Sequence, residues 1–411
     1  MSTRMRRGAT ATAVLALAAV LSACGSTIAG TSAPGEIDVR TLNVGKYSTE
    51  PYHAHNDDYV PSFGVKREIA AMRLADHVAT AYDIDPRLKT GYWPSAISTG
   101  TLPDALGRRA DLQPIAERHK LAYGLVSNGS DKTFGLQVGA DDWATKSTAD
   151  ETIIVSMIMQ FPDAERAKLA ATEFYDTDLA ANPDNQAVPL SKYAGAQSYW
   201  RPGTPFLRTL QTHGSFVVAF LVSTPEANLG ALTALAEKSY DTQLPMLDRF
   251  QPIPLIDVFQ LRWDPDHLSS RILNFDNSTP RPSYTSRRIV TGRQGMLHFA
   301  KNREVAKTSL AALDSDALGV HEDAMVARTP DAATARKIVA DLTVPYEKVR
   351  VAAAPANVPD AACAETKEPR FRNGHYTCVV AYHEYVGFVS AAKIDDVHQR
   401  AAAQYALFAN S

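Results

Sequence analysis

Residues 153–174, IIVSMIMQFPDAERAKLAATEF, decide the fold class, because residues 323–342, DAMVARTPDAATARKIVADL, follow the same plan. In each stretch an apolar run typical of a strand meets Pro-Asp-Ala, at Pro162 and at Pro330. Proline suits the first helical position, where its missing N–H would have no partner, and the next aspartate favours the positive end of the helix dipole. Each stretch therefore predicts a strand that runs directly into a helix.

Apolar residues beyond each Pro-Asp-Ala recur at steps of three and four, which places them on one face of a helix. They are Ala164, Ala167, Ala171 and Phe174 in the first stretch and Ala332, Ala335, Val339 and Leu342 in the second. A hairpin follows each helix, with His213-Gly214 between the strands of the first hairpin and His383-Glu384 between those of the second.

A further helix closes each unit. We place the N-cap of the first at Thr224, and the second carries one apolar face. That face consists of Ile394, Val397, Ala401, Tyr405 and Phe408. The order of elements predicts an α+β fold of duplicated β-α-β-β-α units, in which helices pack on one face of largely antiparallel sheets. Identity between the two halves is low, so chance similarity is the alternative.

The duplication suggests two domains. We assign residues 37–277 to an N-terminal α+β domain, which starts with a helix at about 65–79 and contains the first unit at about 150–245. Residues 278–288, STPRPSYTSRR, form the predicted linker because prolines and hydroxyl residues interrupt regular structure. Residues 289–411 then form the C-terminal domain with the second unit.

The chain begins like an export signal. Arg4, Arg6 and Arg7 precede an uncharged segment, residues 9–21, which is too short to span a bilayer as a helix. The sequence LSAC at residues 21–24 has the form of a bacterial lipobox, in which the cysteine thiol is diacylated. We therefore predict a signal peptide over residues 1–23 and lipidation of Cys24. An ordinary secretory signal that ends near a cysteine is the alternative.

The lipid predicts where the protein resides. A diacylglyceryl group on Cys24 would hold the chain to the outer face of the cytoplasmic membrane, since two acyl chains suffice for stable attachment. Residues 24–36 read as a flexible tether with a reach of roughly 20 Å. The net charge of −3 shows no basic excess, and no basic cluster occurs, so nucleic acid is an improbable partner.

Two further cysteines form an even pair, which in an exported protein predicts a disulfide. We place Cys378 in a strand of the last hairpin and Cys363 in the irregular connection before it. Closing a loop of about 15 residues would contribute roughly 3 kcal/mol to stability. Two free thiols or a metal pair are the alternatives.

Several motifs together resemble a lipoprotein family of mycolate-bearing actinobacteria. They are the lipobox, DVRTLNVGKYSTEP at 38–51, RLADHV with YDIDPRL, FPDAERAKLAA at 161–171, and the terminal YTCVV, YVGFVSA and QRAAAQYAL segments. The resemblance implies an envelope lipoprotein and no particular reaction. In outline the halves are also similar to extracellular sensor modules of actinobacterial receptor kinases.

One constellation has the residue types of a metal site. His53 and His55 lie two apart in YHAHNDDY, so on an extended segment both side chains point the same way, and Asp57 adds a carboxylate. Imidazole and carboxylate ligands suit zinc. A solvated polar loop is the alternative, because no H-E-x-x-H motif occurs.

Nucleophilic catalysis finds little support. There is no G-x-S-x-G motif, and Ser215 stands where an apolar strand begins. His213 and His383 occupy matching hairpin turns, which duplication explains without catalysis. No glycine-rich phosphate loop appears, so the sequence predicts neither a catalytic residue nor a cofactor.

Aromatic residues beside prolines offer a binding surface. Tyr92-Trp93 and Tyr199-Trp200 lie in loop-like stretches, where exposed aromatics commonly contact ligands or partners. Core aromatics that close off loops are the alternative. We therefore predict an envelope lipoprotein without enzymatic activity that binds a lipid, a glycan or an envelope protein, with a metal-dependent hydrolase of envelope material as the alternative. A deep apolar pocket would favour lipid.

Overall fold

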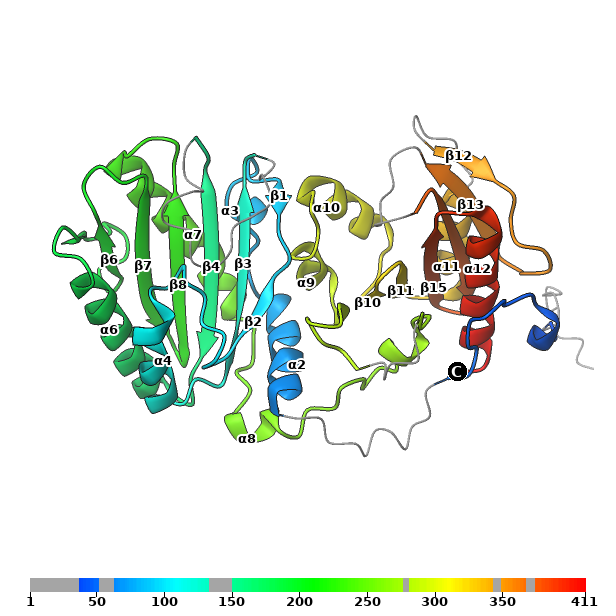
Figure 1. The fold of residues 1–411 in the computed structure, drawn as a ribbon, viewed down its shortest axis with the longest axis horizontal. Helices are drawn as coiled ribbons and strands as arrows, with labels where there is room; N and C mark the ends of the chain where they lie inside the picture. The colour runs from blue at the N-terminus through cyan, green and yellow to red at the C-terminus, as the bar shows by residue number, and fades with distance from the viewer. Residues whose placement is uncertain (1–36, 52–62, 133–149, 276–280, 343–348, 367–373) are drawn as a thin grey trace, which may run out of the picture. The chain divides into compact units, whose positions relative to one another are not determined.

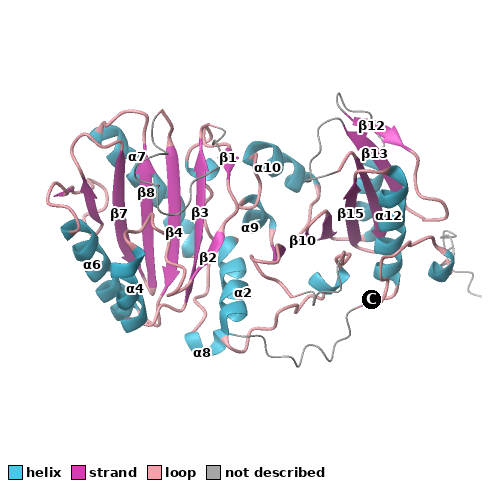
Figure 2. Ribbon diagram, in the orientation of Figure 1, coloured by secondary structure: helices cyan, strands magenta, loops and turns pink. Residues whose placement is uncertain are grey.

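The computed structural model describes residues 37–51, 63–132, 150–275, 281–342, 349–366 and 374–411. Residues 40–411 form one unit, built on two antiparallel sheets with helices packed against them (Figure 1). Both sheets are antiparallel and helices pack against them, which makes the fold α+β as the sequence predicts (Figure 2). A short 3-10 helix, Val39–Thr41, lies near the start of the described residues.

The first sheet has the strand order β1-β3-β4-β8-β7-β6-β5, and β2 pairs with β3. Its strands are β1 (Thr90–Gly91), β2 (Ser95–Ile97), β3 (Tyr123–Ser130), β4 (Ile153–Gln160), β5 (Gln186–Ala187), β6 (Gln197–Trp200), β7 (Phe206–His213) and β8 (Phe216–Ser223). Every residue of β4 and β8 is buried, including Ser156 and Gln160 of β4 and Ser223 of β8.

Helices cover both faces of the first sheet, where the sequence predicts one covered face (Figure 1). One face packs against α2 (Phe63–Ala75), α3 (Ala81–Ile84) and α7 (Leu229–Leu247), and the other against α4 (Arg109–Arg118) and α6 (Ala164–Ala180). Strand β4 shows the reason, because it sends apolar side chains to both faces. Ile154 and Ile158 pack in the core with α2, α3 and α7, and Val155 and Met157 pack in the core with α4 and α6.

The second sheet has the order β12-β13-β14-β15-β11-β10-β9. Its strands are β9 (Arg288–Thr291), β10 (Ala317–His321), β11 (Ala324–Arg328), β12 (Val349–Ala352), β13 (Ala361–Thr366), β14 (Tyr376–Tyr382) and β15 (Tyr385–Ala391). The accompanying helices are α9 (Arg293–Leu297), α10 (Arg303–Ala312), α11 (Ala332–Leu342) and α12 (Ile394–Ala409). Val379 of β14 packs with α11, whereas Tyr382 meets Tyr405 of α12, so helices cover both faces here as well.

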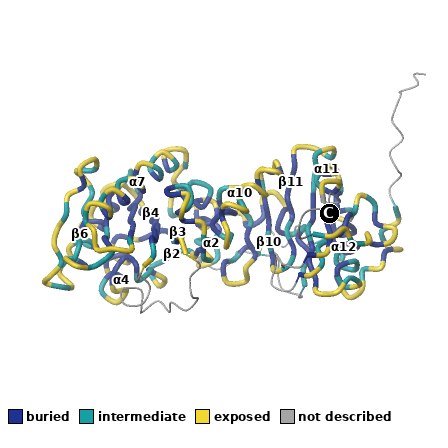
Figure 3. The backbone as a smooth tube through the Cα atoms, turned by 90° about the horizontal axis from the view of Figure 1, so that it is seen from above, coloured by how far each residue is buried: buried dark blue, intermediate teal, exposed yellow. Residues whose placement is uncertain are grey.

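The two sheets share one topology, which fits a duplication. The order β3-β4-β8-β7-β6-β5 of the first sheet repeats as β10-β11-β15-β14-β13-β12 in the second. In both, a helix follows the second of these strands along the chain, α6 or α11, and a last helix closes the unit, α7 or α12. The repeated unit is longer than the predicted β-α-β-β-α, because it includes one earlier strand, β3 or β10, and two further strands after the first helix, β5 and β6 or β12 and β13. Figure 3 shows buried backbone concentrated along the strands of both sheets.

Two helix starts differ from the prediction, each for a local reason. Asp163 is the N-cap of α6 and accepts from the Arg166 N–H at 2.7 Å, so its proline precedes the helix. The N-cap of α7 is Asn228, which accepts from the Ala231 N–H at 3.0 Å, and Thr224 instead donates to the Glu226 carbonyl. Side-chain oxygens at these positions satisfy N–H groups that have no partner inside the helix.

The helix expected at about 65–79 ends earlier than predicted. Helix α2 ends at Ala75, and Thr80 then caps the short helix α3 in a reciprocal capping box with Asp83. Past Ala75 the backbone bonds tighten to three-residue steps, from the His77 N–H to the Leu74 carbonyl and from the Val78 N–H to the Ala75 carbonyl, so the last turn of α2 closes there.

The connection between the halves is packed where the structure describes it. Tyr284, within the predicted linker 278–288, is buried, and its backbone N–H donates to Glu68. Arg288 already begins β9 and is fully buried. Between the end of α7 and β9 lie α8 (Leu255–Val258) and a 3-10 helix (Ser269–Arg271).

Polar contacts join the two halves. Asp76, just after α2, accepts from the backbone N–H groups of Gly292 and Gly295 at the start of α9, each at 2.8 Å. Arg303 of α10 donates from Nη2 to the Asn128 carbonyl of β3 at 2.6 Å. An acid at a helix N-terminus and a buried guanidinium on a strand carbonyl are both stronger than neutral hydrogen bonds.

The segment before the first half also contacts the second. Tyr47 donates to Asp396 of α12 at 2.6 Å and accepts from Nε of Arg400 at 3.0 Å. Arg400 lies over the Tyr47 ring as well. Residues that precede the first domain in sequence therefore pack on the last helix of the chain.

Candidate ligand-binding site

The predicted lipidation and metal residues fall outside the described ranges. Cys24 lies within residues 1–36, and His53, His55 and Asp57 lie within residues 52–62. Lipidation at Cys24 and metal binding at the histidines therefore stay predictions.

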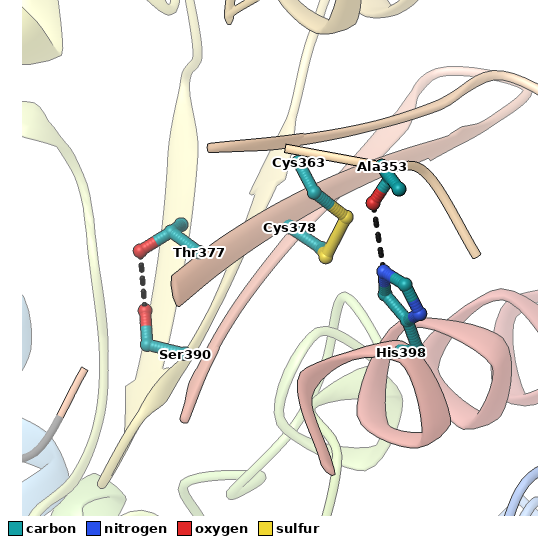
Figure 4. The surroundings of a disulfide bond; sticks show 6 residues. All are labelled: Ala353, Cys363, Thr377, Cys378, Ser390 and His398. Carbon is teal, nitrogen blue, oxygen red and sulfur yellow. Dashed lines mark hydrogen bonds between the residues drawn. A yellow bond between two sulfur atoms is a disulfide. The ribbon is translucent and has the colours of Figure 1, made fainter. Parts of the chain in front are cut away.

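Cys363 and Cys378 form the predicted disulfide (Figure 4). Cys363 lies in β13 rather than in an irregular connection, directly opposite Cys378 of β14, with a Cα–Cα distance of 4.1 Å. Such short spacing is typical of directly opposed strand residues whose backbones do not hydrogen-bond each other. His398 of α12 lies beside the two sulfurs and hydrogen-bonds to the Ala353 carbonyl at 2.7 Å. Because the sulfurs are joined, this group offers no thiolate ligands.

The two turn histidines do not build a catalytic group. His213 is the last residue of β7, one position before the turn, and its Nε2 pairs with Asp248 at 2.7 Å. The Ser215 hydroxyl is buried and has no hydrogen-bond partner among the described residues, so nothing here activates it. His383 lies in the two-residue turn between β14 and β15, as predicted, with its ring against Tyr382.

The four candidate aromatics do not form one surface. Trp93 is 39% exposed, with its ring edge-on to Phe299 and Arg287 over its face. Tyr92 packs partly buried against the core around α6. Trp200 donates from its indole to the Thr204 carbonyl at 2.8 Å and so closes its own turn.

Tyr199 has a different environment. It belongs to strand β6 rather than to a loop, is only 5% exposed, and lines a crevice between α6 and the first sheet. The crevice is partly open to solvent, and its free space is about 10 Å³, which is room for about one water molecule. Its lining residues are Ala105, Leu106, Met157, Phe174, Tyr175, Asp178, Gln197, Tyr199, Arg208, Thr209, Leu210, Ala219 and Phe220. We call it the polar crevice, for the three side chains described next.

Asp178, Tyr199 and Arg208 converge in the polar crevice. The Tyr199 hydroxyl donates to Asp178 and accepts from Nη1 of Arg208 at 3.0 Å. Nη1 of Arg208 also lies 3.6 Å from the Asp178 carboxylate, and Nε donates to the Ala105 carbonyl at 2.9 Å. An acid from α6, a phenol from β6 and a cation from β7 thus form one connected polar group.

Burial shapes the electrostatics of this group. Loss of solvent raises the pKa of the Asp178 carboxyl, and the positive charge of Arg208 acts in the opposite direction. Loss of solvent likewise lowers the pKa of the Arg208 guanidinium, against the attraction of Asp178. Buried charges are costly unless they are paired, and titratable groups perturbed inside a concavity are frequent at binding and active sites.

The rim of the crevice requires a glycine. Gly107 has φ +144° and lies against Asp178, where a Cβ atom would come within 2.7 Å of the carboxylate oxygen. Any larger residue would therefore both strain the backbone and displace the acid.

The second half has the same fold but different residues at the positions equivalent to Arg208 and Tyr199. Arg208 stands five residues before the last residue of β7, and Thr377 stands five before the last residue of β14. Tyr199 is opposite Arg208 on β6, and Ala364 is opposite Thr377 on β13. Threonine and alanine thus occupy the positions of the arginine and tyrosine, so the fold itself does not require the polar crevice.

Sequence reasoning named Tyr199 but missed its two partners. Both stand where an apolar residue is expected: Asp178 continues the helix stripe four residues after Phe174, and Arg208 lies between Phe206 and Leu210 on the inward side of β7. A charged residue on an otherwise apolar stripe is the sequence signal that could have identified both partners.

None of the described helices is long and apolar enough to cross a membrane. A search of curated proteins finds no match. Two family models together match most of the chain: domain of unknown function DUF7373, N-terminal, at residues 57–263, and its C-terminal counterpart at residues 268–411. Each model covers one of the two sheets, and their boundary precedes the predicted linker. The chain therefore belongs to the DUF7373 family.

Proposed function

We propose that this chain is a binding module of the cell envelope without enzymatic activity, anchored through Cys24, and that its ligand binds in the polar crevice of the first half. The second half acts as a framework that supports the first. Lipid, glycan and envelope protein are the ligand classes that the sequence favours.

The observation that carries the proposal is the asymmetry between two halves of one topology. A buried acid and a buried cation are expensive, and a fold that needed them would have them in both halves. Here Asp178, Tyr199 and Arg208 occur together in the first half, whereas Thr377 and Ala364 stand in the second. Polar groups that converge in a concavity without being needed for the fold point to a ligand.

The size of the crevice limits the classes of ligand that it can hold. Its free space of about 10 Å³ holds about one water molecule, far below the range of about 300–1,000 Å³ that is usual for sites of drug-sized ligands. Apolar side chains fill both helix–sheet layers of the first half, and the crevice has charged groups in its lining. These features favour a small polar group at the end of a longer ligand over an acyl chain.

Native mass spectrometry of the full chain, purified from an actinobacterial host, tests the proposal. The wild-type protein should retain a bound small species that Tyr199→Phe and Arg208→Met both lose. Tyr193→Phe is the matched control, because it removes a tyrosine hydroxyl outside the crevice that bonds to Asp241. Melting curves establish that each variant is folded.

Two results would contradict the proposal. One is a bound species that survives both crevice substitutions in folded protein. The other is metal-dependent turnover of envelope material that His53→Ala and His55→Ala abolish, because that would make the chain the hydrolase named as the alternative.

A further inference from the structure

Three side chains with metal-binding chemistry meet on the second sheet. Cys363 of β13 and Cys378 of β14 are paired across the strands, and His398 of α12 lies beside them (Figure 4). The two sulfurs and one imidazole nitrogen all lie within 4.8 Å of one another. Zinc holds sulfur at about 2.3 Å and imidazole nitrogen at about 2.0 Å, so its tetrahedral ligands are roughly 3.5–3.8 Å apart. Once the S–S bond is open, small side-chain rotations reach that spacing.

The fold does not require these three residues. In the first half the equivalent strand pair is Ser198 and Thr209, and the closing helix α7 contributes Tyr240, whose hydroxyl lies 3.0 Å from that of Thr209. Three hydroxyl groups therefore take the place of two sulfurs and an imidazole. A disulfide needs no histidine beside it, whereas a site of two thiolates does, because three protein ligands are usual even for an open zinc site.

His398 is placed to exchange its present partner for a metal ion. Its Nε2–H donates to the Ala353 carbonyl at 2.7 Å, on the side of the ring that faces the sulfurs (Figure 4). Neutral imidazole carries its proton on either ring nitrogen, so a shift of the proton to Nδ1 frees the Nε2 lone pair. The side chain is only partly buried, so an ion can approach the sulfurs from this side.

Charge and ligand type together select the ion. Cys363 and Cys378 are buried, with exposed fractions of 1% and 0%. Two thiolates and one Zn²⁺ carry no net charge, which matters because an uncompensated charge is costly to bury. Cu⁺ on the same ligands would leave one negative charge, and Mg²⁺ and Ca²⁺ prefer oxygen ligands. The three ligands therefore suit Zn²⁺, with its fourth position left to water.

We propose that Cys363, Cys378 and His398 form a redox-controlled zinc site, which the disulfide blocks and its reduction opens. A dithiol reductant supplies two electrons and two protons: the S–S bond breaks, both cysteines become thiols, and the dithiol closes to its own disulfide. Zn²⁺ then displaces the two thiol protons and takes the imidazole lone pair. This site is separate from the polar crevice, so either proposal can fail without the other.

Zinc titration of the oxidised and the reduced full chain tests the site. Cys24→Ala serves as the parent, because Cys363 and Cys378 are then its only cysteines. A phosphine opens the disulfide without competing for the metal. We expect the reduced protein to bind a single Zn²⁺ per chain and to release two protons, and the oxidised protein to bind none here. Co²⁺ in place of zinc should give thiolate-to-metal charge-transfer absorption, which imidazole and carboxylate ligands do not.

His398→Ala isolates the third ligand. It keeps both cysteines, so the oxidised variant should melt like the parent, and its reduced form should bind zinc about a hundredfold more weakly, since even the loss of an outer-shell partner costs up to that much. His383→Ala is the matched control and should leave zinc affinity unchanged, because this histidine lies at the exposed turn of the same hairpin, against Tyr382. Circular dichroism follows folding throughout. A reduced chain that unfolds without zinc and refolds with it also supports the site.

Three results would overturn the inference. One is a reduced protein, folded or unfolded, that binds no zinc and shows no cobalt–thiolate absorption. Another is equal zinc binding by the oxidised and reduced chains, which would place the ion elsewhere, for example at His53 and His55. The third is a reduced His398→Ala variant that binds zinc as tightly as the parent.

Discussion

One buried cross-strand position holds a different chemical pair in each half. In the second half it is the disulfide of Cys363 and Cys378, which faces α12. In the first half the equivalent pair is Ser198 and Thr209, whose hydroxyls hydrogen-bond at 2.7 Å, and Tyr240 of α7 contacts Thr209 at 3.0 Å. The repeat therefore shows that two small hydroxyl side chains fit this position between strands and helix.

The repeat predicts the effect of replacing the disulfide. Cys363→Ser alone should destabilise the second half by about 2–4 kcal/mol, because the cross-link over 15 residues is lost. The double variant Cys363→Ser with Cys378→Thr should recover about 1 kcal/mol through a hydrogen bond like that of the first half. Urea unfolding of the three proteins measures both steps. A double variant no more stable than the single one would show that the two positions are not equivalent.

His298 lies in the junction between the halves and is fully buried. Its Nε2–H donates to the carbonyls of Ala75 and Val78, so Nδ1 is unprotonated and accepts from the Ser127 hydroxyl at 2.6 Å. Burial, reinforced by the charge of Arg303, lowers the pKa of His298 to about 4. The imidazole is therefore neutral in the folded protein at neutral pH.

This environment predicts an acid-sensitive junction. The pKa of His298 is about 6.5 when unfolded and about 4 when folded, so the unfolded chain binds the extra proton between these values. The stability contribution is complete above pH 6.5 and is lost as pH falls toward 4, with an amplitude of about 3 kcal/mol. His298→Gln should flatten this part of the pH–stability curve, and His383→Gln, at an exposed turn, should not. Equal slopes in all three proteins would refute the assignment.

At the scale of elements, a sequence motif that is typical of a helix start does not cap helix α7. Thr224-Pro225 is a typical helix start, yet Asn228 caps the helix through the Ala231 N–H. Asn228→Ala should therefore cost about 1 kcal/mol of unfolding free energy, whereas Thr224→Ala should cost less than half as much. Thermal unfolding compares the two, and a larger loss for Thr224→Ala would contradict the structure.

The elements that the sequence predicts well are those whose pattern is local. The paired strand–helix stretches, the hairpin around His383 and the cysteine pair all follow from spacing and residue type. The second covered face of each sheet does not, because a mostly apolar run such as β4 has the same appearance whether or not it is sandwiched between helices.

The candidate site depends on contacts that no local pattern contains. Asp178 and Tyr199 come from a helix and a strand, and Arg208 joins them only because β6 and β7 pair in one register. A single sequence gives no register between strands that are joined by loops of unknown course. Only the misplaced charges on apolar stripes pointed to this group.

At the scale of the molecule, anchoring is independent of the crevice. Cys24→Ala removes the only predicted acyl acceptor, so the variant should leave the detergent phase in a partitioning assay and accumulate as precursor. Its crevice should still bind the ligand, because Cys24 precedes the unit formed by residues 40–411. If the variant partitions into detergent as fully as the parent, lipid attachment at Cys24 is wrong.

We propose that two copies of one fold divide their roles, with the ligand confined to the first. Hydrogen exchange of the full chain, with and without a saturating ligand, tests this most directly, because a bound ligand slows the opening of the segments it contacts. Protection should appear in α6, in β6 and β7, and in the loop that carries Gly107, while β13, β14 and α12 exchange as before. Protection centred on the second sheet, or none at saturation, would contradict the account.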